Sequence, residues 1–216
     1  MRASSQTSAE KSQSSKPSKV VQLDEYWKAS TMKVKDLKKL RERGLLPNPQ
    51  IYEWTVTKGQ DCPTPDTHQA VVFIAHFKCG FGGFPSKFLE RICRHYGIEI
   101  AHLLPNAVAM LSVFAFLCEA WLGVKPYLDL WRYFYSATYY AKNLAIGSVG
   151  FSLKKGNNYI TFLIKTSWKG YQRKWFYIQL HEESLIKGQA LMLVSNERWR
   201  STTPMNERMQ RHIARI

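Results

Sequence analysis

The sequence is poor in acidic residues. Its 216 residues include 16 Asp and Glu against 31 Lys and Arg, which leaves a formal net charge of +15. A surface this positive attracts polyanions such as nucleic acid, but it does not indicate any particular fold. Charge alone supports only sequence-independent binding, so a basic surface that serves solubility is the competing interpretation.

The sequence also lacks closely spaced cysteine pairs and a secretory signal. Its cysteines are too scattered for a disulfide framework, and we interpret them as reduced, intracellular thiols. A zinc site is suggested by four residues, His76, Cys79, Cys93 and His95. However, the C-x-H spacing of the last two is shorter than that of usual zinc fingers, and Cys93 falls on the apolar face of a predicted helix. We therefore predict no metal and no other cofactor.

Catalytic motifs are absent as well. The GFGGF segment at 80–84 lacks both the Lys-Ser/Thr ending of a P-loop and the spacing of a dinucleotide fingerprint, which favours a plain tight turn. There is no G-x-S-x-G motif. The acidic residues fall mostly on predicted helix faces or in loops, where they do not form the carboxylate cluster of a two-metal site. We expect no catalytic residues, no small-molecule substrate and no enzymatic activity.

The longest apolar run, 107–122, is too short to span a bilayer. It falls below the ~20 residues that a transmembrane helix needs, and it carries Glu119. We expect a helix buried in the middle of the fold, capped by Asn106 and closed by Gly123, with Pro126 beginning the next helix. Glu119 is predicted to pair with a buried cation or a helix-end amide and to do no chemistry.

Helical periodicity marks two further segments. In residues 31–43, apolar side chains recur at helical spacing before the stop signal Gly44. The opposite face of this helix is basic, which is typical of a solvated surface, with phosphate contact as the alternative. Residues 86–96 form a second amphipathic pattern that Gly97 ends. Residues 70–77 begin with the pattern of a strand and continue with that of a helical turn. The run is too short to decide between a strand and a helix.

Strand-like patterns follow beyond residue 145. Residues 148–153 and 159–165 are separated by a Gly-Asn-Asn turn, and 174–180 forms an aromatic third strand. The predicted class is α+β, with a helical core, a small C-terminal antiparallel β-sheet and a disordered N-terminal tail. Residues 1–22 are the disordered tail because they lack large apolar groups. One domain is expected over 23–182, followed by a basic C-terminal tail or short helix at 183–216.

One segment mixes basic and aromatic residues. Residues 166–176 read TSWKGYQRKWF, a mixture that other proteins use to hold single strands by stacking and phosphate contact. An ordinary strand with aromatic residues inward and charges outward is the favoured interpretation, and stacking on nucleic acid is the alternative. The candidate nucleic-acid contacts from this segment and the basic helix are Lys165, Lys169, Arg173, Lys174, Lys38, Lys39 and Arg41.

An ordered series of short motifs runs through the middle of the chain. These motifs are Val71-Val72-Phe73, Gly80-Phe81-Gly82, Pro85, His102-Leu103, Pro105-Asn106-Ala107, Leu117-Cys118-Glu119-Ala120, Leu122-Gly123, Pro126, Leu130-Trp131-Arg132, Lys169-Gly170-Tyr171 and Trp175-Phe176-Tyr177. In this order and spacing they resemble a known family, the putative gypsy-type transposase domain of plant transposable-element proteins. The similarity covers roughly residues 30–180. It departs from the pattern in an extra Gly before Pro85 and in Tyr171, where Trp is commoner.

The resemblance implies an origin more than an activity, since the family offers no catalytic residues to carry over. It implies a retroelement-derived, non-enzymatic, gag-like or accessory protein with a basic nucleic-acid-binding surface. Self-association is a further expectation, and no membrane partner is expected. Two alternatives stay open: the N-terminal remnant of a larger polyprotein whose catalytic part is missing, and a domesticated protein-interaction module in which the charge is incidental.

Overall fold

The computed structural model describes residues 27–48, 53–57, 59–140, 146–157, 168–180 and 199–216. The predicted disordered tail, the predicted strand at 159–165 with Lys165, and residues 183–198 of the predicted C-terminal tail lie outside the described residues. The predicted domain boundaries after residues 22 and 182 fall there too, so they stay predictions.

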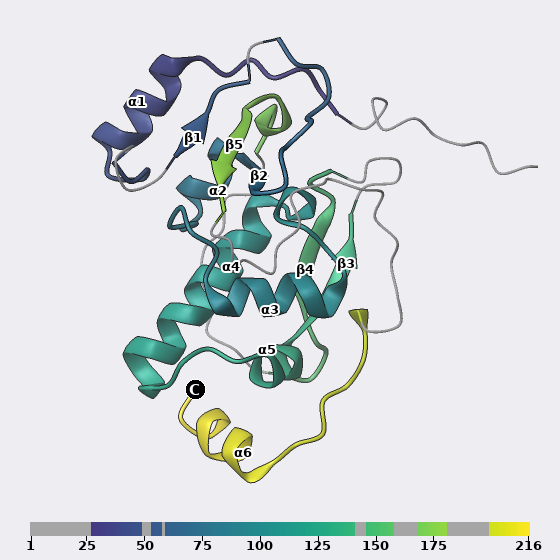
Figure 1. The fold of residues 1–216 in the computed structure, drawn as a ribbon. Helices are drawn as coiled ribbons and strands as arrows, with labels where there is room; N and C mark the ends of the chain where they lie inside the picture. The colour runs from purple at the N-terminus through teal and green to yellow at the C-terminus, as the bar shows by residue number, and fades with distance from the viewer. Residues whose placement is uncertain (1–26, 49–52, 58, 141–145, 158–167, 181–198) are drawn as a thin grey trace, which may run out of the picture.

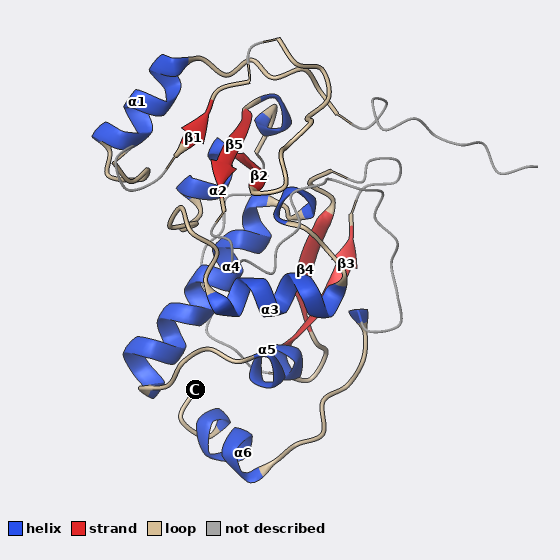
Figure 2. Cartoon of the chain, viewed as in Figure 1, coloured by secondary structure: helices blue, strands red, loops and turns tan. Residues whose placement is uncertain are grey.

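Helices and short strands alternate along the chain in a mixed α+β arrangement (Figures 1 and 2). The α-helices are α1 (Val34–Glu42), α2 (Ile74–Lys78), α3 (Lys87–Tyr96), α4 (Pro105–Phe116), α5 (Leu128–Phe134) and α6 (Glu207–Ile213). The other helical segments are the 3-10 turns η2 (Ile100–His102) and η4 (Tyr171–Arg173) and the π-helical η3 (Leu117–Leu122), which continues α4. The strands are β1 (Trp54–Thr55), β2 (Gln69–Phe73), β3 (Tyr135–Tyr139), β4 (Val149–Leu153) and β5 (Trp175–Gln179).

The strands form two separate antiparallel sheets. One has the order β1-β5-β2, with Phe73 opposite Trp175, and the other pairs β3 with β4. The expectation of a single C-terminal sheet is therefore wrong, because β5 lies between two strands from the N-terminal half. A strand that is buried on both faces, as β5 is from Trp175 to Ile178, suits a central position where both edges find hydrogen-bond partners.

Residues 69–85 connect the first sheet to the helices. The segment that the sequence left undecided is a strand, β2, followed directly by the short helix α2, so it opens as a strand and continues as a helical turn. Gly80 follows with a φ of +93°, and an added Cβ there would lie 2.7 Å from Oγ of Ser112. Glycine is needed both for this backbone conformation and for the close approach of the loop to α4.

The main core gathers aromatic side chains around Trp131, which is fully buried on α5. Its ring centroid lies 5.2 Å from that of Phe114, 4.3 Å from that of Tyr135 and 4.9 Å from that of Phe151. These contacts are edge-to-face or tilted, as aromatic quadrupoles prefer. The cluster thus joins α4 and α5 to both strands of the β3-β4 sheet.

The start of α4 differs from the prediction. Leu104 is the N-cap residue and Pro105 occupies the first turn, so Asn106 does not cap the helix. Proline suits the first helical position because the backbone N–H that it lacks would have no partner there, and the cap therefore lies two residues earlier than predicted. At the other end, Gly123 adopts the predicted left-handed conformation with a φ of +67°. Helix α5 begins at Leu128, two residues after Pro126.

The far end of α4 and η3 is only partly buried, contrary to the expectation for an apolar helix, because Cys118 and Leu122 are buried but their neighbours are exposed. The side chain of Phe116 is 71% exposed and that of Trp121 is 64% exposed. Glu119 is exposed too, so the prediction that apolar neighbours enclose it is wrong. By length and composition Pro105–Leu122 could cross a membrane, and 39% of it is buried. A helix of 18 residues is about 27 Å long, and the C-terminal segment contacts its last turn, where Nη1 of Arg215 donates to the Leu122 carbonyl oxygen at 3.2 Å.

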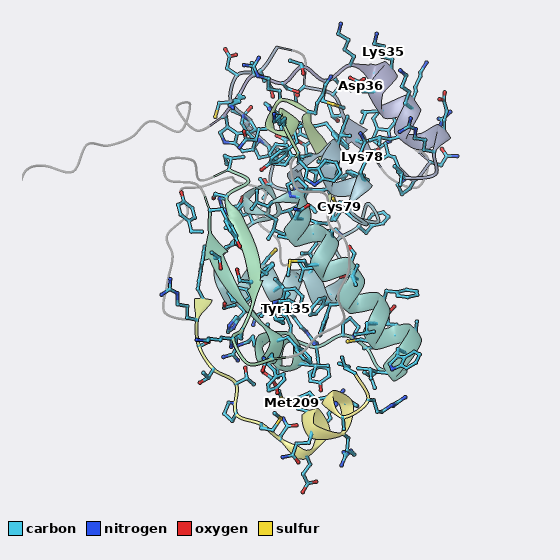
Figure 3. The ribbon with its side chains drawn as sticks, turned by 180° about the vertical axis from the view of Figure 1, so that it is seen from behind. Lys35, Asp36, Lys78, Cys79, Tyr135 and Met209 are labelled. Atoms are coloured by element: carbon cyan, nitrogen blue, oxygen red, sulfur yellow. The ribbon has the colours of Figure 1, made fainter. Side chains whose placement is uncertain are left out.

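The described C-terminal residues, 199–216, pack onto the body. Trp199 is buried and its Nε1 donates to the Tyr96 carbonyl oxygen at 2.9 Å. Asn206 caps α6, and Met209 on that helix is fully buried. Figure 3 places Met209 at one end of the molecule and Lys35 on α1 at the other. The segment predicted as a basic tail or short helix therefore contains a helix that belongs to the core.

Candidate nucleic-acid interface

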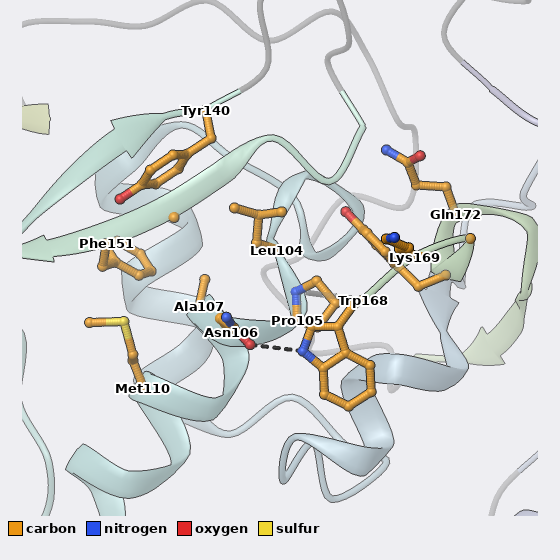
Figure 4. A pocket seen from close by; sticks show the side chains of 13 residues that line it. Leu104, Pro105, Asn106, Ala107, Met110, Tyr140, Phe151, Trp168, Lys169 and Gln172 are labelled. Atoms are coloured by element: carbon orange, nitrogen blue, oxygen red, sulfur yellow. Dashed lines mark hydrogen bonds between the residues drawn. The ribbon is translucent and has the colours of Figure 1, made fainter. Parts of the chain in front are cut away.

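A cavity of about 600 Å³ lies between the start of α4, strand β4 and the loop that leads into η4 (Figure 4). Its walls are mainly apolar and aromatic. The lining residues are Leu104, Pro105, Asn106, Ala107, Met110, Tyr140, Gly150, Phe151, Trp168, Lys169, Gly170, Tyr171 and Gln172. Five of these thirteen, 168–172, belong to the basic and aromatic segment that the sequence singled out.

Trp168 is held in place at the cavity wall. Its Nε1 donates to Oδ1 of Asn106 at 2.8 Å, the bond drawn in Figure 4. The ring also packs partly against the main core and against a second buried cluster that includes Trp27, Phe73 and Trp175. The Asn106 side chain, expected to cap α4, therefore fixes an aromatic ring instead. A ring fixed in this way offers a stacking surface without losing rotamer freedom on binding.

Two tyrosines complete the aromatic walls. The Tyr171 hydroxyl donates to the Gly147 carbonyl oxygen at 2.8 Å, and burial raises the pKa of this hydroxyl well above its usual range. The exposed Tyr140 hydroxyl shares a 2.9 Å hydrogen bond with Oγ of Ser152. An added Cβ at Gly150 would lie 2.5 Å from Cε2 of Tyr140, so the glycine lets this ring lie across β4. Both rings are thus positioned before any ligand arrives.

Lys169 supplies the charge at the cavity. It is the charged member of the lining and its side chain is exposed. The other polar groups at the walls are the amides of Asn106 and Gln172 and the tyrosine hydroxyls. An apolar, aromatic space with one ammonium at its edge suits a planar ring that carries a phosphate, which is the chemistry of a nucleotide.

The positive surface continues from this loop toward α1. Thr31, just before α1, donates from its backbone N–H to the Arg173 carbonyl oxygen at 2.8 Å and from its hydroxyl to the same oxygen at 2.9 Å. Arg173 is exposed at the end of η4. On α1, Leu37 and Leu40 are buried, whereas the predicted contacts Lys38, Lys39 and Arg41 are exposed. The structure therefore joins two basic segments that lie about 130 residues apart in the sequence.

Lys174, another predicted contact, makes polar contacts within the fold. Its Nζ lies 3.1 Å from Oδ2 of Asp36 and donates to the Thr31 carbonyl oxygen at 3.0 Å. Partial burial acts to raise the pKa of Asp36, but the hydrogen bond and charge of Lys174 bring it below its usual value. Lys174 thus ties β5 to α1 and is engaged within the fold. Lys165 lies outside the described residues.

The sequence analysis missed Asn106, Met110, Tyr140 and Phe151 as parts of this site. Their positions carry no local signal, because α4 and β4 meet the η4 loop only through tertiary packing. Asn106 belonged to a motif that carried the family resemblance, but its contact with Trp168 spans 62 residues.

The cysteines and buried histidine form no metal centre in the described part of the chain, where no group of three or more His, Cys, Asp or Glu side chains is gathered. Nε2 of His76 lies 3.0 Å from the Leu103 carbonyl oxygen, and burial lowers the pKa of this histidine to about 4. Burial, together with the charge of Glu119, raises the pKa of Cys118 to about 12. Burial also raises the pKa of Cys93. These thiols stay protonated and behave as core side chains.

Comparison with known proteins gives one family match. Residues 71–139 match the family model described as "putative gypsy type transposon". The match runs from β2 to the end of β3, so it includes the α4 side of the cavity and ends before the loop with Trp168. No curated protein and no solved structure matches the chain.

Proposed function

Because residues 71–139 carry a gypsy-type transposon-related domain, we propose that the protein is a non-enzymatic accessory protein of a retroelement that binds single-stranded nucleic acid. The observation that carries this proposal is the aromatic cavity beside Trp168, with Lys169 at its edge. Binding is electrostatic and independent of sequence along the backbone of the strand. The net charge of +15 favours binding of a polyanion, and the cavity offers a place for a base.

In the proposed complex the phosphates follow the basic surface. Lys169 and Arg173 contact the backbone next to the cavity, and the exposed cations of α1 extend the path. Each contact releases a condensed counterion, so the affinity falls as salt is added. Lys174 contributes indirectly by holding β5 and α1 together through Asp36.

An unpaired base occupies the cavity in this proposal. Trp168 and the tyrosine rings offer faces on which any base can stack, which requires no hydrogen-bond readout. A paired base in a duplex is already stacked and cannot enter without leaving the helix, which costs a few kcal/mol. The proposal therefore implies a preference for single strands over a duplex of the same length.

Replacing Trp168 with alanine is expected to weaken binding of a single-stranded oligonucleotide by about 5- to 150-fold. This range corresponds to the ~1–3 kcal/mol that stacking on one aromatic side chain contributes. Binding of a duplex is expected to change little, because a paired base does not reach the ring. Fluorescence anisotropy of labelled single-stranded and duplex oligonucleotides, titrated with each protein, measures both affinities.

Two variants serve as controls. Trp168→Phe keeps a stacking face but loses the hydrogen bond to Asn106, and it should retain most of the affinity. Phe116→Ala removes an exposed aromatic ring at the other end of α4, about 16 Å along the helix from Pro105, and it should leave binding unchanged. Equal losses for single strands and duplex, or no loss in Trp168→Ala, would contradict the role given to the cavity.

A further inference from the structure

The chain from Trp199 to the start of α6 crosses a cationic site on the body of the fold. Nη2 of Arg132, on α5, donates to Oγ of Ser201 at 2.8 Å and to the Thr202 carbonyl oxygen at 3.1 Å. Nζ of Lys154, just after β4, donates to the Ser201 carbonyl oxygen at 3.2 Å. Two cations therefore meet at Ser201, and its hydroxyl lies against the guanidinium of Arg132.

The positive charge of this site is only partly balanced. The carboxylate of Asp129 lies 3.6 Å from Nη1 of Arg132, and 52% of the Asp129 side chain is exposed. Nε of Arg132 is buried and has no hydrogen-bond partner among the described residues. Partial burial and the charge of Arg132 lower the pKa of Lys154. The site therefore suits an added anionic group, which accepts charge-assisted hydrogen bonds from arginine and lysine.

The sequence around Ser201 suits an enzyme that adds such a group. Arginine stands three residues and one residue before Ser201, at Arg198 and Arg200. Arginine-directed protein kinases select serine by charges placed in this way. Ser201 is half-buried, but residues 201–206 form neither helix nor strand, and Arg200 and Thr202 on either side of it are exposed. A segment of this kind opens locally at low cost and can enter a kinase cleft as an extended chain.

We propose that Ser201 is a phosphorylation site and that Arg132 and Lys154 bind the resulting phosphate. The γ-phosphoryl group of ATP is transferred to Oγ of Ser201. The bond from the γ-phosphorus to the β–γ bridging oxygen breaks as the bond to Oγ forms, ADP leaves, and the hydroxyl proton passes to the base of the kinase. The phosphate carries about −1.5 to −2 charges and offers three acceptor oxygens to the two cations.

Phosphorylation of Ser201 is expected to fasten the C-terminal segment, 199–216, to the body of the fold. Trp199 before the site is buried, and so is Met209 on α6 after it. Between these two anchors, the bond from Arg132 to a neutral hydroxyl is replaced by contacts with a phosphate, and arginine–phosphate pairs are frequently bidentate. The modification thus acts as a switch in how firmly the last described segment is held.

Two other hydroxyl groups have an arginine three residues before them. Thr203 follows Arg200 at this spacing, but its Oγ1 is buried and has no hydrogen-bond partner among the described residues. A phosphate on that buried oxygen does not fit without displacing the segment, so it would loosen what a phosphate on Ser201 fastens. Ser5 follows Arg2 within the N-terminal tail, and it supplies a control site on the same chain.

Incubation of the purified full chain with ATP and cyclic-AMP-dependent protein kinase, an arginine-directed enzyme, tests whether Ser201 is modified. Peptide mass spectrometry is expected to place a phosphate on Ser201. Ser201→Ala should remove this phosphate without affecting modification of Ser5, and Arg198→Gln should slow the modification of Ser201. A phosphate found on Ser5 or Thr203 but not on Ser201 would overturn the proposal.

Phosphorus NMR tests the role of the two cations, using full chains synthesised with phosphoserine at position 201 or at position 5. The second acid dissociation constant of the phosphate on Ser201 is expected to exceed that of the phosphate on Ser5 by ~10-fold or more, because nearby cations stabilise the dianion. Arg132→Gln and Lys154→Gln should each lose part of this increase, and either variant suffices if the other fails to fold. Identical titrations of the two phosphates would contradict a phosphate site at Arg132 and Lys154.

Denaturant unfolding of the same two phosphorylated chains measures the fastening itself. At neutral pH the unfolding equilibrium constant of the chain phosphorylated at Ser201 is expected to be lower by ~10-fold, since the dianion is stabilised only in the folded state. Equal stability of the two chains would show that the phosphate does not hold the segment, and the switch would be refuted. None of these results depends on nucleic-acid binding at the Trp168 cavity, to which neither Arg132 nor Lys154 belongs.

Discussion

Replacing Trp131 with alanine is expected to lower the free energy of unfolding by about 3–5 kcal/mol. The indole is fully buried and packs against rings from α3, α4, β3 and β4. Its removal loses both the burial of a large apolar surface and the contacts of the rings around it, which cannot close the space without moving several elements. Urea unfolding of both proteins, followed by circular dichroism, measures the loss.

Trp121→Ala is the matched control for this prediction. It also deletes an indole, but from a mostly exposed position where one hydrogen bond to Arg215 is lost. A loss of ~1 kcal/mol is expected, since a single intramolecular hydrogen bond contributes about that much. If the two variants lost equal stability, Trp131 would not be the centre of the core.

Lowering the pH from about 6.5 to about 4 is expected to cost roughly 3 kcal/mol of stability through His76 alone. The pKa of this histidine falls from 6.5 to about 4 in the folded protein, because burial disfavours the charged imidazolium. Below pH 6.5 the unfolded chain binds the proton and the folded protein does not, so unfolding becomes easier with each step down. The stability that neutral His76 gives is complete above its unfolded pKa and is lost as the pH falls through the folded pKa.

The difference between wild type and His76→Gln isolates this effect. Glutamine does not titrate, and its amide can still donate to the Leu103 carbonyl oxygen that lies beside Nε2 of His76. Denaturant unfolding across this pH range should show the wild type losing stability more steeply than the variant. Parallel pH profiles of the two proteins would show that His76 carries no such penalty.

Local patterns predicted the elements that depend on neighbouring residues in the sequence. The amphipathic spacing around Leu37 and Leu40 gave α1, and Gly97 and Gly123 end helices in the left-handed conformation as expected. Strands β4 and β5 also lie where alternation and aromatic content placed them. Each of these features depends on side chains within a few residues of one another, which a sequence displays directly.

Features that depend on distant segments were predicted wrongly or not at all. The pairing of β5 with β1 and β2 joins residues more than 100 positions apart, and no local pattern encodes it. Glu119 was expected to be enclosed because its sequence neighbours are apolar, but it is exposed while Cys118 and Leu122 in the same segment are buried. Apolar neighbours in the sequence do not ensure burial, because other elements cover only some of the side chains of that turn.

The candidate site also combines a part that local sequence predicts with a part that only the packing of distant segments creates. The mixture of aromatic and basic residues at 166–176 pointed to a contact surface, and the structure lines a cavity with five of them. The sequence favoured an ordinary strand for this segment, yet Trp168 and Lys169 precede β5 in a loop, and alternation applies from Trp175 onward. The opposite wall, from α4 and β4, could not be predicted because tertiary packing alone brings it there.

The salt dependence of single-strand binding tests the nucleic-acid role most directly. The basic surface on α1 is expected to contact phosphates, so removing three charges in Lys38/Lys39/Arg41→Ala should make the slope of log affinity against log salt shallower by about 2. Lys125/Arg200/Arg211→Ala removes the same charge from exposed positions away from α1, two of them in the C-terminal segment at the far end of the molecule, and should leave the slope unchanged (Figure 1). No binding at low salt, or equal slopes for the two triple variants, would contradict a nucleic-acid interface at this surface.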